Sequence, residues 1–201
     1  MNDNYTDVQL RIIKAARKLF AKKGFKGATI RGIASEAKVS VAMINYHFNS
    51  KEELFDSIME ETFAKIHEES LSILDSGLPF FELIRKWVYS HYDLYLKYPD
   101  YPFILNSESV KNPQTWIHKP EPAHHVLKKL SKLLEKEKAK GTVQPISASD
   151  LLLLFISLVD YPILGKTIAL QCLNLPEKEY MKSLHKYKEC VADFLIRAIK
   201  K

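Results

Sequence analysis

Apolar residues recur every three or four positions near the start of the chain, which predicts an amphipathic helix there. Thr6-Asp7-Val8-Gln9 has the spacing of a capping box, in which the Thr hydroxyl and the Gln side chain bond the first free amides of a helix. The apolar positions that follow lie on one helical face: Val8, Ile12, Ala15, Ala16, Leu19 and Phe20. Gly24 is expected to end this helix, because glycine adopts the left-handed C-terminal conformation at little cost.

Two short helices and a longer one are predicted after this point. Residues 30–37 and 41–48 carry apolar positions three and four apart, and each segment follows a hydroxyl residue that can cap a helix, Thr29 and Ser40 respectively. The sequence Ser-Lys-Glu-Glu that comes next is a second capping box and opens a helix over 51–74. Helix, tight turn and helix at this spacing form the helix-turn-helix plan.

The rest of the chain continues as helices separated by proline and glycine, with a kink expected at Pro162. We expect a loop over 111–120 and helices over 79–97, 103–110, 122–140, 150–172 and 176–200. Strong period-two alternation is missing from the sequence, so the predicted fold class is all-α. The predicted organisation is an N-terminal three-helix helix-turn-helix domain (1–50), followed by a larger helical bundle (51–201).

The net charge of +6 is concentrated in the first quarter of the chain. Residues 1–51 hold ten Lys or Arg against three Asp or Glu, whereas residues 52–201 hold twenty against twenty-one. A basic head on a nearly neutral body is typical of a nucleic-acid-binding module attached to a regulatory domain. A solvated lysine-rich face explains the charge distribution equally well.

Cysteine usage and hydropathy bear on the compartment. The two cysteines, Cys172 and Cys190, are too few for a disulfide framework. Charged residues interrupt the first twenty positions, which is unlike a signal peptide. The longest apolar run, Leu151–Val159, is too short to span a bilayer. We therefore expect a cytoplasmic protein with no membrane partner.

The segment 41–48 is the candidate recognition element. It combines Asn, Tyr and His with small apolar residues and has no Asp, Glu, Lys or Arg. A DNA major groove is about 12 Å wide and admits one α-helix, and an exposed helix with hydrogen-bonding groups suits it. The alternative is a small helical bundle whose polar face meets only water.

The first quarter of the chain resembles the N-terminal domain of the TetR family of repressors. The resemblance covers residues 6–54, with generic likeness beyond, and the segments that carry it are Arg11-Ile12-Ile13-Lys14-Ala15-Ala16, Leu19-Phe20, Gly24-Phe25, Ala28-Thr29-Ile30, Ile33-Ala34, Val39-Ser40, Tyr46-His47-Phe48 and Ser50-Lys51-Glu52-Glu53-Leu54. It implies a ligand-responsive transcriptional regulator of the repressor kind. Such a protein binds a near-palindromic DNA operator as a homodimer, and it is neither an enzyme nor dependent on a cofactor.

The resemblance also assigns contacts to the DNA backbone. Tyr46, His47 and Lys51 match the family's phosphate contacts. Thr29 and Ser40 stand at helix N-termini, where amides and hydroxyls bind phosphate. The alternatives are that Thr29 and Ser40 only cap their helices, and that His47 is a packed or solvated histidine.

Base-edge contacts fall to the other positions of the second short helix. Val41, Ala42, Met43 and Asn45 match the positions that face bases in the family. An asparagine can pair with adenine, and small apolar side chains can touch a thymine methyl group. Arg31 could reach either a phosphate or a base.

Two departures from the family pattern matter. Lys38 stands in the turn where the family often has glycine, so a residue with a Cβ is expected to take a positive φ there. Ala42 and Asn45 replace a more common glycine and aromatic residue, so the operator sequence cannot be transferred from a relative. The alternative for Met43 is a place in the core, although Ile44 and Phe48 already supply the buried face.

An enzyme is the main alternative from another class, and its strongest support is a possible metal site. Glu121 and His124 have Glu-x-x-His spacing, with His118 and His125 near them. A di-iron helical bundle needs two such motifs and further carboxylates. A solvated junction between loop and helix explains the same residues, so we predict no metal ligands and no catalytic residues. A helical bundle that only binds other proteins is a third reading, and it leaves the basic head unexplained.

The last two helices are expected to form the homodimer. Residues 151–159 are apolar on nearly all sides, and such a helix must be covered on more than one face. The final helix contributes Met181, Leu184, Cys190, Val191, Phe194, Leu195 and Ile199. The alternative is a single core helix in a monomer.

The body is expected to hold a small, mainly apolar effector between the helices of residues 51–140. The helix over 79–97 has aromatic groups on more than one face, and inward tyrosines would give an apolar cavity with a few hydrogen-bonding groups. The candidate lining residues are Trp87, Tyr92, Tyr95, Phe103 and Trp116. A filled aromatic core remains the alternative, because periodicity cannot reveal a void.

Overall fold

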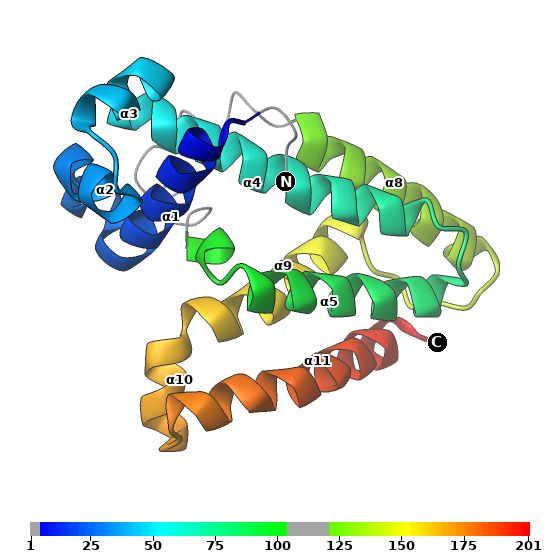
Figure 1. Cartoon of the computed structure of the whole chain (residues 1–201). Helices are drawn as coiled ribbons and strands as arrows, with labels where there is room; N and C mark the ends of the chain where they lie inside the picture. Colours follow the sequence, from blue (N-terminus) through cyan, green and yellow to red (C-terminus); the bar gives the residue numbers. More distant parts are fainter. Residues whose placement is uncertain (1–4, 104–120) are drawn as a thin grey trace. The chain divides into compact units, whose positions relative to one another are not determined.

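The computed structural model describes residues 5–103 and 121–201, and their regular structure is helical apart from one isolated β-bridge (Figure 1). The fold class predicted from the sequence, all-α, is confirmed. The helices are α1 (Asp7–Gly27), α2 (Ile30–Ala37), α3 (Val41–Phe48), α4 (Lys51–Leu74), α5 (Phe80–Lys97), α8 (Glu121–Ala139), α9 (Ala148–Leu164), α10 (Lys166–Leu173) and α11 (Glu177–Ile199). The helix expected over 103–110, beyond its first residue, and the loop over 111–120 lie outside the described residues.

The described residues divide into two compact units. Unit 1 comprises residues 5–64 and Phe103, and unit 2 comprises residues 65–102 and 121–201. The division falls inside α4, whereas the sequence-based boundary was placed after residue 50. The first turns of α4 belong to unit 1 because their apolar side chains, including Phe55 and Ile58, are buried there.

Unit 1 is organised around the apolar face of α1. The buried side chains of this face meet those of α2, α3 and the start of α4, and the fully buried ones include Ile12, Ala16, Ile33, Ile44, Leu54 and Ile58. Three phenyl rings pack together at one end, with centroid distances of 5.8 Å for Phe20–Phe25, 4.9 Å for Phe20–Phe55 and 5.0 Å for Phe25–Phe55. Burial of these faces holds the short helices, which would be unstable alone.

Gly24 interrupts α1 rather than ending it. Its φ of 67° and ψ of 172° break the helical hydrogen bonding, and one further turn follows to Gly27. The capping box at the other end forms as predicted, with Thr6 accepting a hydrogen bond from the Gln9 amide and Gln9 accepting one from the Thr6 amide. The expected helix end at Gly24 is therefore a kink within α1, and the chain continues from it to α2.

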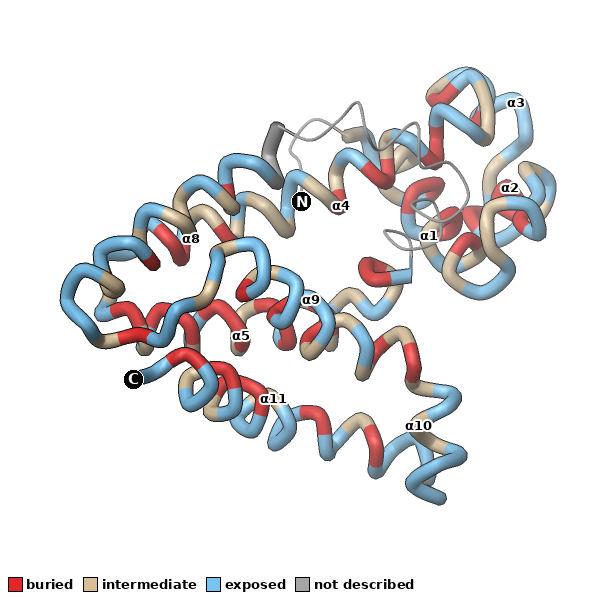
Figure 2. Tube along the Cα trace, turned by 180° about the vertical axis from the view of Figure 1, so that it is seen from behind, coloured by how far each residue is buried: buried red, intermediate tan, exposed pale blue. Residues whose placement is uncertain are grey.

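In unit 2, α9 is the central helix and contacts α5, α8, α10 and α11. Its Phe155 ring stacks on the Trp87 indole of α5 with centroids 3.9 Å apart. Figure 2 shows the buried residues running along α5 and along the side of α11 that packs against it. The chain end closes the unit, because the Gln144 amide donates to the Ile199 carbonyl and the Lys201 amide donates to the Thr142 carbonyl.

The apolar segment expected to be one helix over 150–172 is two helices. Pro162 lies inside α9, and the bend of 73° comes at Gly165, where α10 begins. Within the described residues, no single helix has the length and hydropathy to cross a membrane. The pair α9 and α10 meets that criterion only when its two bent segments are taken together, by length and composition.

Candidate nucleic-acid interface

The turn between α2 and α3 is set by the caps on either side of it. Thr29 Oγ1 accepts a hydrogen bond from the Gly32 amide at 3.1 Å, and Ser40 Oγ accepts one from the Met43 amide at 3.2 Å. Both hydroxyl residues are exposed. The caps therefore form as the sequence predicts, and the hydroxyls lie at helix N-termini that are open to a ligand.

Lys38 turns the chain between the two helices in the left-handed conformation, with φ 55° and ψ 48°. The positive φ expected from the missing glycine is thus present. Arg11 of α1 stabilises this turn from the side. Its Nη2 donates to the carbonyl oxygens of Ala37 and Lys38, both at 2.7 Å, and its Nε donates to the Ala37 oxygen at 3.2 Å.

The sequence reasoning did not identify Arg11 as part of the interface. The only signal is that a cation stands next to the buried face of α1, directly before Ile12. The carbonyl groups that this side chain bonds are far away in the sequence, and helical periodicity cannot identify them. The structure adds Arg11 to the site as the side chain that holds the two helices of the motif in their geometry.

The second helix of the motif presents an exposed, uncharged face. Ile44 and Phe48 are buried and anchor α3 from behind. The predicted base-facing residues Val41, Ala42, Met43 and Asn45 are all exposed, and Tyr46 is exposed to 80%. Met43 accordingly lies at the surface rather than in the core.

His47 and Arg31 occupy different surroundings. The His47 ring is half-buried between neighbours, with centroids 5.1 Å from Tyr46 and 6.4 Å from Phe48. Arg31 is exposed in the first turn of α2. Arg31 can therefore extend freely, whereas His47 is held against two rings of its own helix.

Lys51 is the one predicted phosphate contact whose charged group faces inward. Its Nζ donates to the carbonyl oxygens of Phe25 at 3.1 Å and Ala28 at 3.3 Å, and lies 4.2 Å from the centroid of the Phe25 ring. The ammonium thus caps the link between α1 and α2. The backbone amide of Lys51, in the first turn of α4, is the group that remains suited to an anion.

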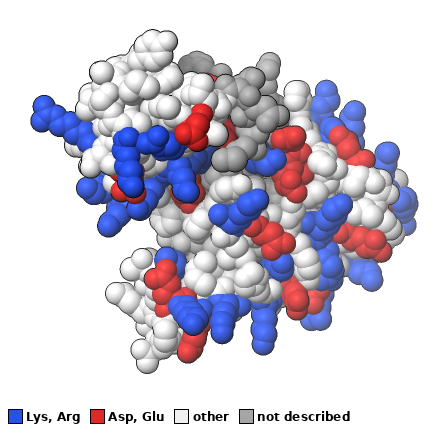
Figure 3. All heavy atoms as spheres, viewed as in Figure 1, with Lys and Arg blue, Asp and Glu red and all other residues white. Residues whose placement is uncertain are grey.

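Positive charge surrounds α3 without being part of it. Seven of the ten Lys and Arg residues of positions 1–51 belong to α1. Figure 3 shows Lys and Arg side chains over α1, beside an area over α3 that has no charged side chain. Such an arrangement provides long-range attraction for a polyanion and leaves the contacting helix free for hydrogen bonds.

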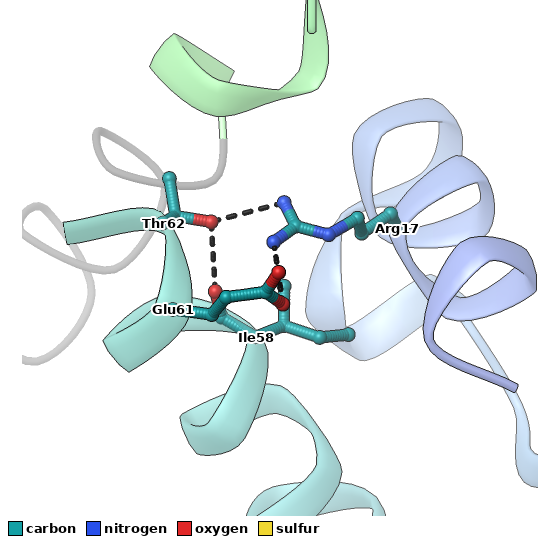
Figure 4. A network of polar contacts seen from close by, with 4 residues as sticks. All are labelled: Arg17, Ile58, Glu61 and Thr62. Atoms are coloured by element: carbon teal, nitrogen blue, oxygen red, sulfur yellow. Dashed lines mark hydrogen bonds and ion pairs between the residues drawn. The ribbon is translucent and has the colours of Figure 1, made fainter. Parts of the chain in front are cut away.

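A buried polar contact ties α1 to α4 within unit 1 (Figure 4). Arg17 Nη1 donates to Thr62 Oγ1 at 2.9 Å, and Nη2 lies 3.2 Å from the Glu61 carboxylate. Thr62 is fully buried, and its hydroxyl donates to the Ile58 carbonyl at 2.7 Å. The first helix of unit 1, α1, is thereby linked to α4, which contributes residues to both units.

Three of the five predicted effector-binding residues lie together in the core of unit 2. Trp87, Tyr92 and Tyr95 are buried in the filled core of unit 2. Phe103 belongs to unit 1 and is 37% exposed, and Trp116 lies outside the described residues. The Trp87 indole packs against Phe155 of α9, and the Tyr92 hydroxyl reaches the Leu158 carbonyl of the same helix.

The polar tips of these core residues are satisfied internally. Trp87 Nε1 donates to Ser70 Oγ at 3.2 Å, and Ser70 Oγ lies 3.2 Å from His91 Nε2. His91 Nδ1 lies 3.1 Å from the Trp87 carbonyl, which can only accept, so Nδ1 carries the proton and Nε2 accepts from Ser70. Burial lowers the pKa of His91 to about 4.

A second buried polar group sits beside α9. The Tyr92 hydroxyl donates to the Leu158 carbonyl at 2.8 Å, and the Tyr95 hydroxyl hydrogen-bonds the Asp160 carboxylate. Burial raises the pKa of Asp160 to about 6, although the hydrogen bond from Tyr95 acts in the opposite direction. This carboxyl is therefore costly to keep ionised in the folded protein.

The described residues hold no cluster of three or more His, Cys, Asp or Glu with the geometry of a metal site. His124 and His125 lie at the start of α8, whereas His118 and the side chain of Glu121 fall outside the described structure.

A helix-turn-helix with an exposed second helix and a basic first helix defines a class of DNA-binding domain. Residues 12–58 match the family model described as bacterial regulatory proteins, tetR family. The match confirms the resemblance to the TetR family that the sequence indicated over residues 6–54, in the first quarter of the chain.

Individual relatives agree with this assignment. The chain is 37% identical over 49% of its length to the HTH-type transcriptional repressor NicS of Pseudomonas putida, covering 47% of that protein. It is 33% identical over 50% of its length to the uncharacterized HTH-type transcriptional regulator YerO of Bacillus subtilis, covering 35% of that protein. The matched region thus spans about half or less of these relatives.

Among solved structures, the fold is similar to that of the ketosteroid transcriptional regulator KstR2 of Mycobacterium tuberculosis. The TM-score is 0.75 at 14% identity, over 98% of this chain and 97% of the other. At this identity the likeness concerns the fold alone.

Proposed function

We propose that this chain is a transcriptional repressor that binds duplex DNA through α3. The observation that supports this most directly is the exposed, uncharged face of α3, anchored by Ile44 and Phe48 and oriented by Arg11. Asn45 would pair with an adenine edge, and Val41, Ala42 and Met43 would contact thymine methyl groups or neighbouring base edges.

Backbone contacts would come from the groups around this helix. Tyr46, His47 and Arg31 would reach phosphates with their side chains. Thr29 and Ser40 would contribute hydroxyls and the amides of helix N-termini. Lys51 would take part through its backbone amide, since its ammonium bonds the Phe25 and Ala28 carbonyls.

A binding titration tests this function. Fluorescence anisotropy would compare the intergenic DNA upstream of the chain's own gene with a scrambled duplex of equal length at several salt concentrations. We expect preference for the upstream DNA and an affinity that falls steeply with salt, because each phosphate contact releases counterions. Asn45→Ala should relax the choice at one base pair. Equal affinity for both duplexes, or binding that is independent of salt, would contradict the function.

The proposed regulator acts as a homodimer. The outward faces of α9 and α11 support this, because Leu153, Leu154, Ile156 and Phe194 are exposed. The other apolar residues of α11 that the sequence suggested for this interface, Leu184, Val191, Leu195 and Ile199, are buried in the core of their own unit. A two-fold dimer would present two α3 helices to a near-palindromic operator.

Light scattering at micromolar concentration tests the dimer. We expect twice the mass of one chain for the unmodified protein and a monomeric mass for Leu154→Lys combined with Phe194→Lys. Lys182→Met, at an exposed polar position of α11, serves as the matched control and should leave the mass unchanged. A dimer that survives the double substitution would refute this interface.

The proposed regulator releases DNA when a small, mainly apolar effector binds to unit 2. Support comes from α4, which contributes residues to both units and is bonded to α1 through Arg17. The effector would favour a separation of the two DNA-binding heads that misses the half-sites, and DNA would weaken effector binding by the same factor. Thermal stabilisation by apolar metabolites, measured together with DNA release, tests the coupling. A ligand that stabilises the protein and leaves DNA affinity unchanged would contradict it.

A further inference from the structure

A groove of about 490 Å³ lies between the second half of α4 and α5, within unit 2. The two helices run antiparallel (Figure 1), and a hydrogen bond from the Ser90 hydroxyl to the Glu69 carboxylate joins them at the groove. Sites for small molecules usually measure about 300–1,000 Å³, so the groove is large enough to hold one. Its charged lining residues are Lys65, Glu69, Lys86, Asp93 and Lys97.

The groove lies apart from the proposed dimer face. Its lining comes from α4, from α5 and from Tyr98, which directly follows α5. The exposed apolar residues that we give to the dimer belong to α9 and α11. The exposure of the groove residues therefore does not depend on the proposed dimer.

The two carboxylates of the groove are already engaged. Glu69 accepts the hydrogen bond from Ser90. Asp93 accepts one from the Lys188 ammonium of α11 at 2.7 Å, and the same ammonium lies 5.0 Å from the centroid of the Tyr89 ring. Neighbouring side chains thus hold both carboxylates.

The three lysines of the groove are less engaged. Lys86 and Lys97 form no ion pair within the described part of the chain, and the Lys97 ammonium lies 5.3 Å from the centroid of the Tyr98 ring. Lys65 approaches Glu68 at 3.8 Å, but these side chains are 48% and 76% exposed, and such a pair contributes little. The groove therefore offers ammonium groups that an anion can bind.

Two of these lysines stand at the same end of the groove. The bond between Glu69 and Ser90 sets the register of the antiparallel helices. Lys65 lies one helical turn before Glu69, and Lys97 lies two turns after Ser90, so both positions lead toward that end. Lys86 lies one turn before Ser90, toward the other end. A pair of cations from different helices thus faces a single cation across the length of the groove.

We propose that this groove binds a small organic phosphate, with the phosphate at Lys65 and Lys97 and the organic part against Leu94 and Tyr89. Lysine ammonium groups bind phosphate as point charges, and a phosphate ester carries close to two negative charges, which two ammonium groups can balance. Leu94 and Tyr89 are half-buried lining residues that provide apolar surface beside these cations. The ligand class differs from the mainly apolar effector of the proposed function, and binding does not require DNA.

Two fluorescent probes test the ligand class. Methylumbelliferyl phosphate carries close to two negative charges at neutral pH, and methylumbelliferyl sulfate has the same rings with one. Fluorescence anisotropy at constant ionic strength should show saturable binding of one phosphate probe per chain. The sulfate probe should bind about fivefold more weakly, because it gains less from the second ammonium group. Equal affinity of the two probes, or the lack of saturable binding, would overturn the proposal.

Substitution of the paired lysines tests the location of the site. Lys65→Met combined with Lys97→Met should weaken binding of the phosphate probe about tenfold. Lys128→Met combined with Lys132→Met removes two exposed charges of α8 outside the groove and is the matched control. Thermal unfolding would confirm that both double variants fold. An equal loss of affinity in the two double variants would show a general effect of charge and would overturn the site.

Lys86→Met tests which end of the groove holds the phosphate. This substitution removes one cation from the opposite end, so we expect a loss of about twofold or less in the affinity for the phosphate probe. A loss as large as that of the Lys65→Met, Lys97→Met double variant would overturn the placement of the phosphate.

A regulatory effect of the phosphate rests on the proposed function. Lys65 is the first residue of unit 2, and the preceding residues of α4 belong to unit 1. A ligand bound to Lys65 and Lys97 would restrain α4 against α5 at this point. The phosphate probe should therefore change the affinity of the unmodified protein for its upstream DNA about threefold or more, and should leave that of the Lys65→Met, Lys97→Met double variant unchanged.

DNA titrations with and without the probe, at constant ionic strength, separate this inference from the proposed function. Equal responses of the unmodified protein and the double variant, or no response in the unmodified protein, would overturn the regulatory effect. Failure of the unmodified protein to bind its upstream DNA would contradict the proposed function and leave the probe-binding result in place.

Discussion

At the scale of single residues, the DNA-binding motif depends on cations that point inward. Arg11 satisfies the carbonyl groups at the end of α2, where helix termination leaves them without helical partners. Lys51 does the same for the link between α1 and α2. In the proposed function, these side chains would affect DNA binding indirectly, Arg11 by fixing the turn before α3 and Lys51 by fixing the link before α2.

Arg11→Met should lower both stability and DNA affinity. The substitution keeps an unbranched apolar stem and removes three hydrogen bonds to the Ala37 and Lys38 carbonyls, which we expect to cost about 1–3 kcal/mol. Urea unfolding and DNA titration would measure the two effects. Lys14→Met, at an exposed position of the same helix, should change stability by less than about 0.5 kcal/mol. Equal stability of the two variants would argue against a role for Arg11 in the turn.

Tyr46→Phe and Lys51→Ala should weaken DNA binding for different reasons. Tyr46 is 80% exposed, so the phenylalanine variant should keep its stability and lose about five- to tenfold in affinity across all DNA sequences. Lys51→Ala should in addition lose about 1 kcal/mol of stability, because two carbonyls lose a charged donor. Thermal unfolding of the free proteins distinguishes the two cases. If Lys51→Ala is as stable as the unmodified protein, the Lys51 ammonium does not stabilise the fold.

At the scale of elements, the contact between α1 and α4 is the link on which the proposed effector coupling depends. The Arg17 side chain is only 13% exposed, and it bonds two successive residues of α4. By contrast, Lys18 on the next position pairs with Glu36 across an open surface, with exposures of 66% and 39%. Charge pairs of the second kind contribute little to stability.

Arg17→Met should therefore destabilise unit 1 by about 1–2 kcal/mol, because a partly buried carboxylate and a buried hydroxyl each lose a partner. Lys18→Met is the matched control and should stay within about 0.5 kcal/mol of the unmodified protein. Urea denaturation provides both values. In the proposed regulator, Arg17→Met should also reduce the release of DNA that the effector causes. If the effector releases DNA from this variant as it does from the unmodified protein, the Arg17 contact does not carry the coupling.

At the scale of the whole molecule, two buried titratable groups give stability opposite dependences on pH. His91 has a folded pKa of about 4 against an ordinary 6.5, so the unfolded chain binds more protons between these values and stability falls as the pH drops through them. Asp160 has a folded pKa of about 6 against 3.8, so the folded protein binds more protons and stability falls as the pH rises. The two effects largely cancel.

Asp160→Asn should remove the loss of stability that Asp160 causes as the pH rises. The variant should be more stable than the unmodified protein at pH 7, by up to about 3 kcal/mol, and the difference should disappear below about pH 4. The variant should then lose stability on acidification, because His91 acts without opposition. Urea unfolding at several pH values measures this, with Asp56→Asn on the exposed face of α4 as the control for loss of one charge. A difference that does not depend on pH would contradict the buried carboxylate.

Much of unit 1 could be predicted from sequence because its rules are local. The capping residues Thr6, Thr29 and Ser40 act on amides three positions away, and the apolar spacing of α1, α2 and α3 defines their inward faces within each helix. The positive φ of Lys38 was expected from the resemblance, since the family often has glycine at this position. The all-α fold and the exposed recognition helix were therefore accessible without a structure.

The tertiary structure alone decided where long-range partners lie. The Lys51 ammonium is used internally because the carbonyls of residues 25 and 28 come beside it only after folding. Only the folded structure shows which neighbours Trp87, Tyr92 and Tyr95 have in the core of unit 2, because a helix that is apolar on several faces does not specify what packs against each face. The bend at Gly165 and the contact of α11 with α9, in which the Tyr180 hydroxyl donates to the Pro162 carbonyl, join residues that local periodicity cannot relate.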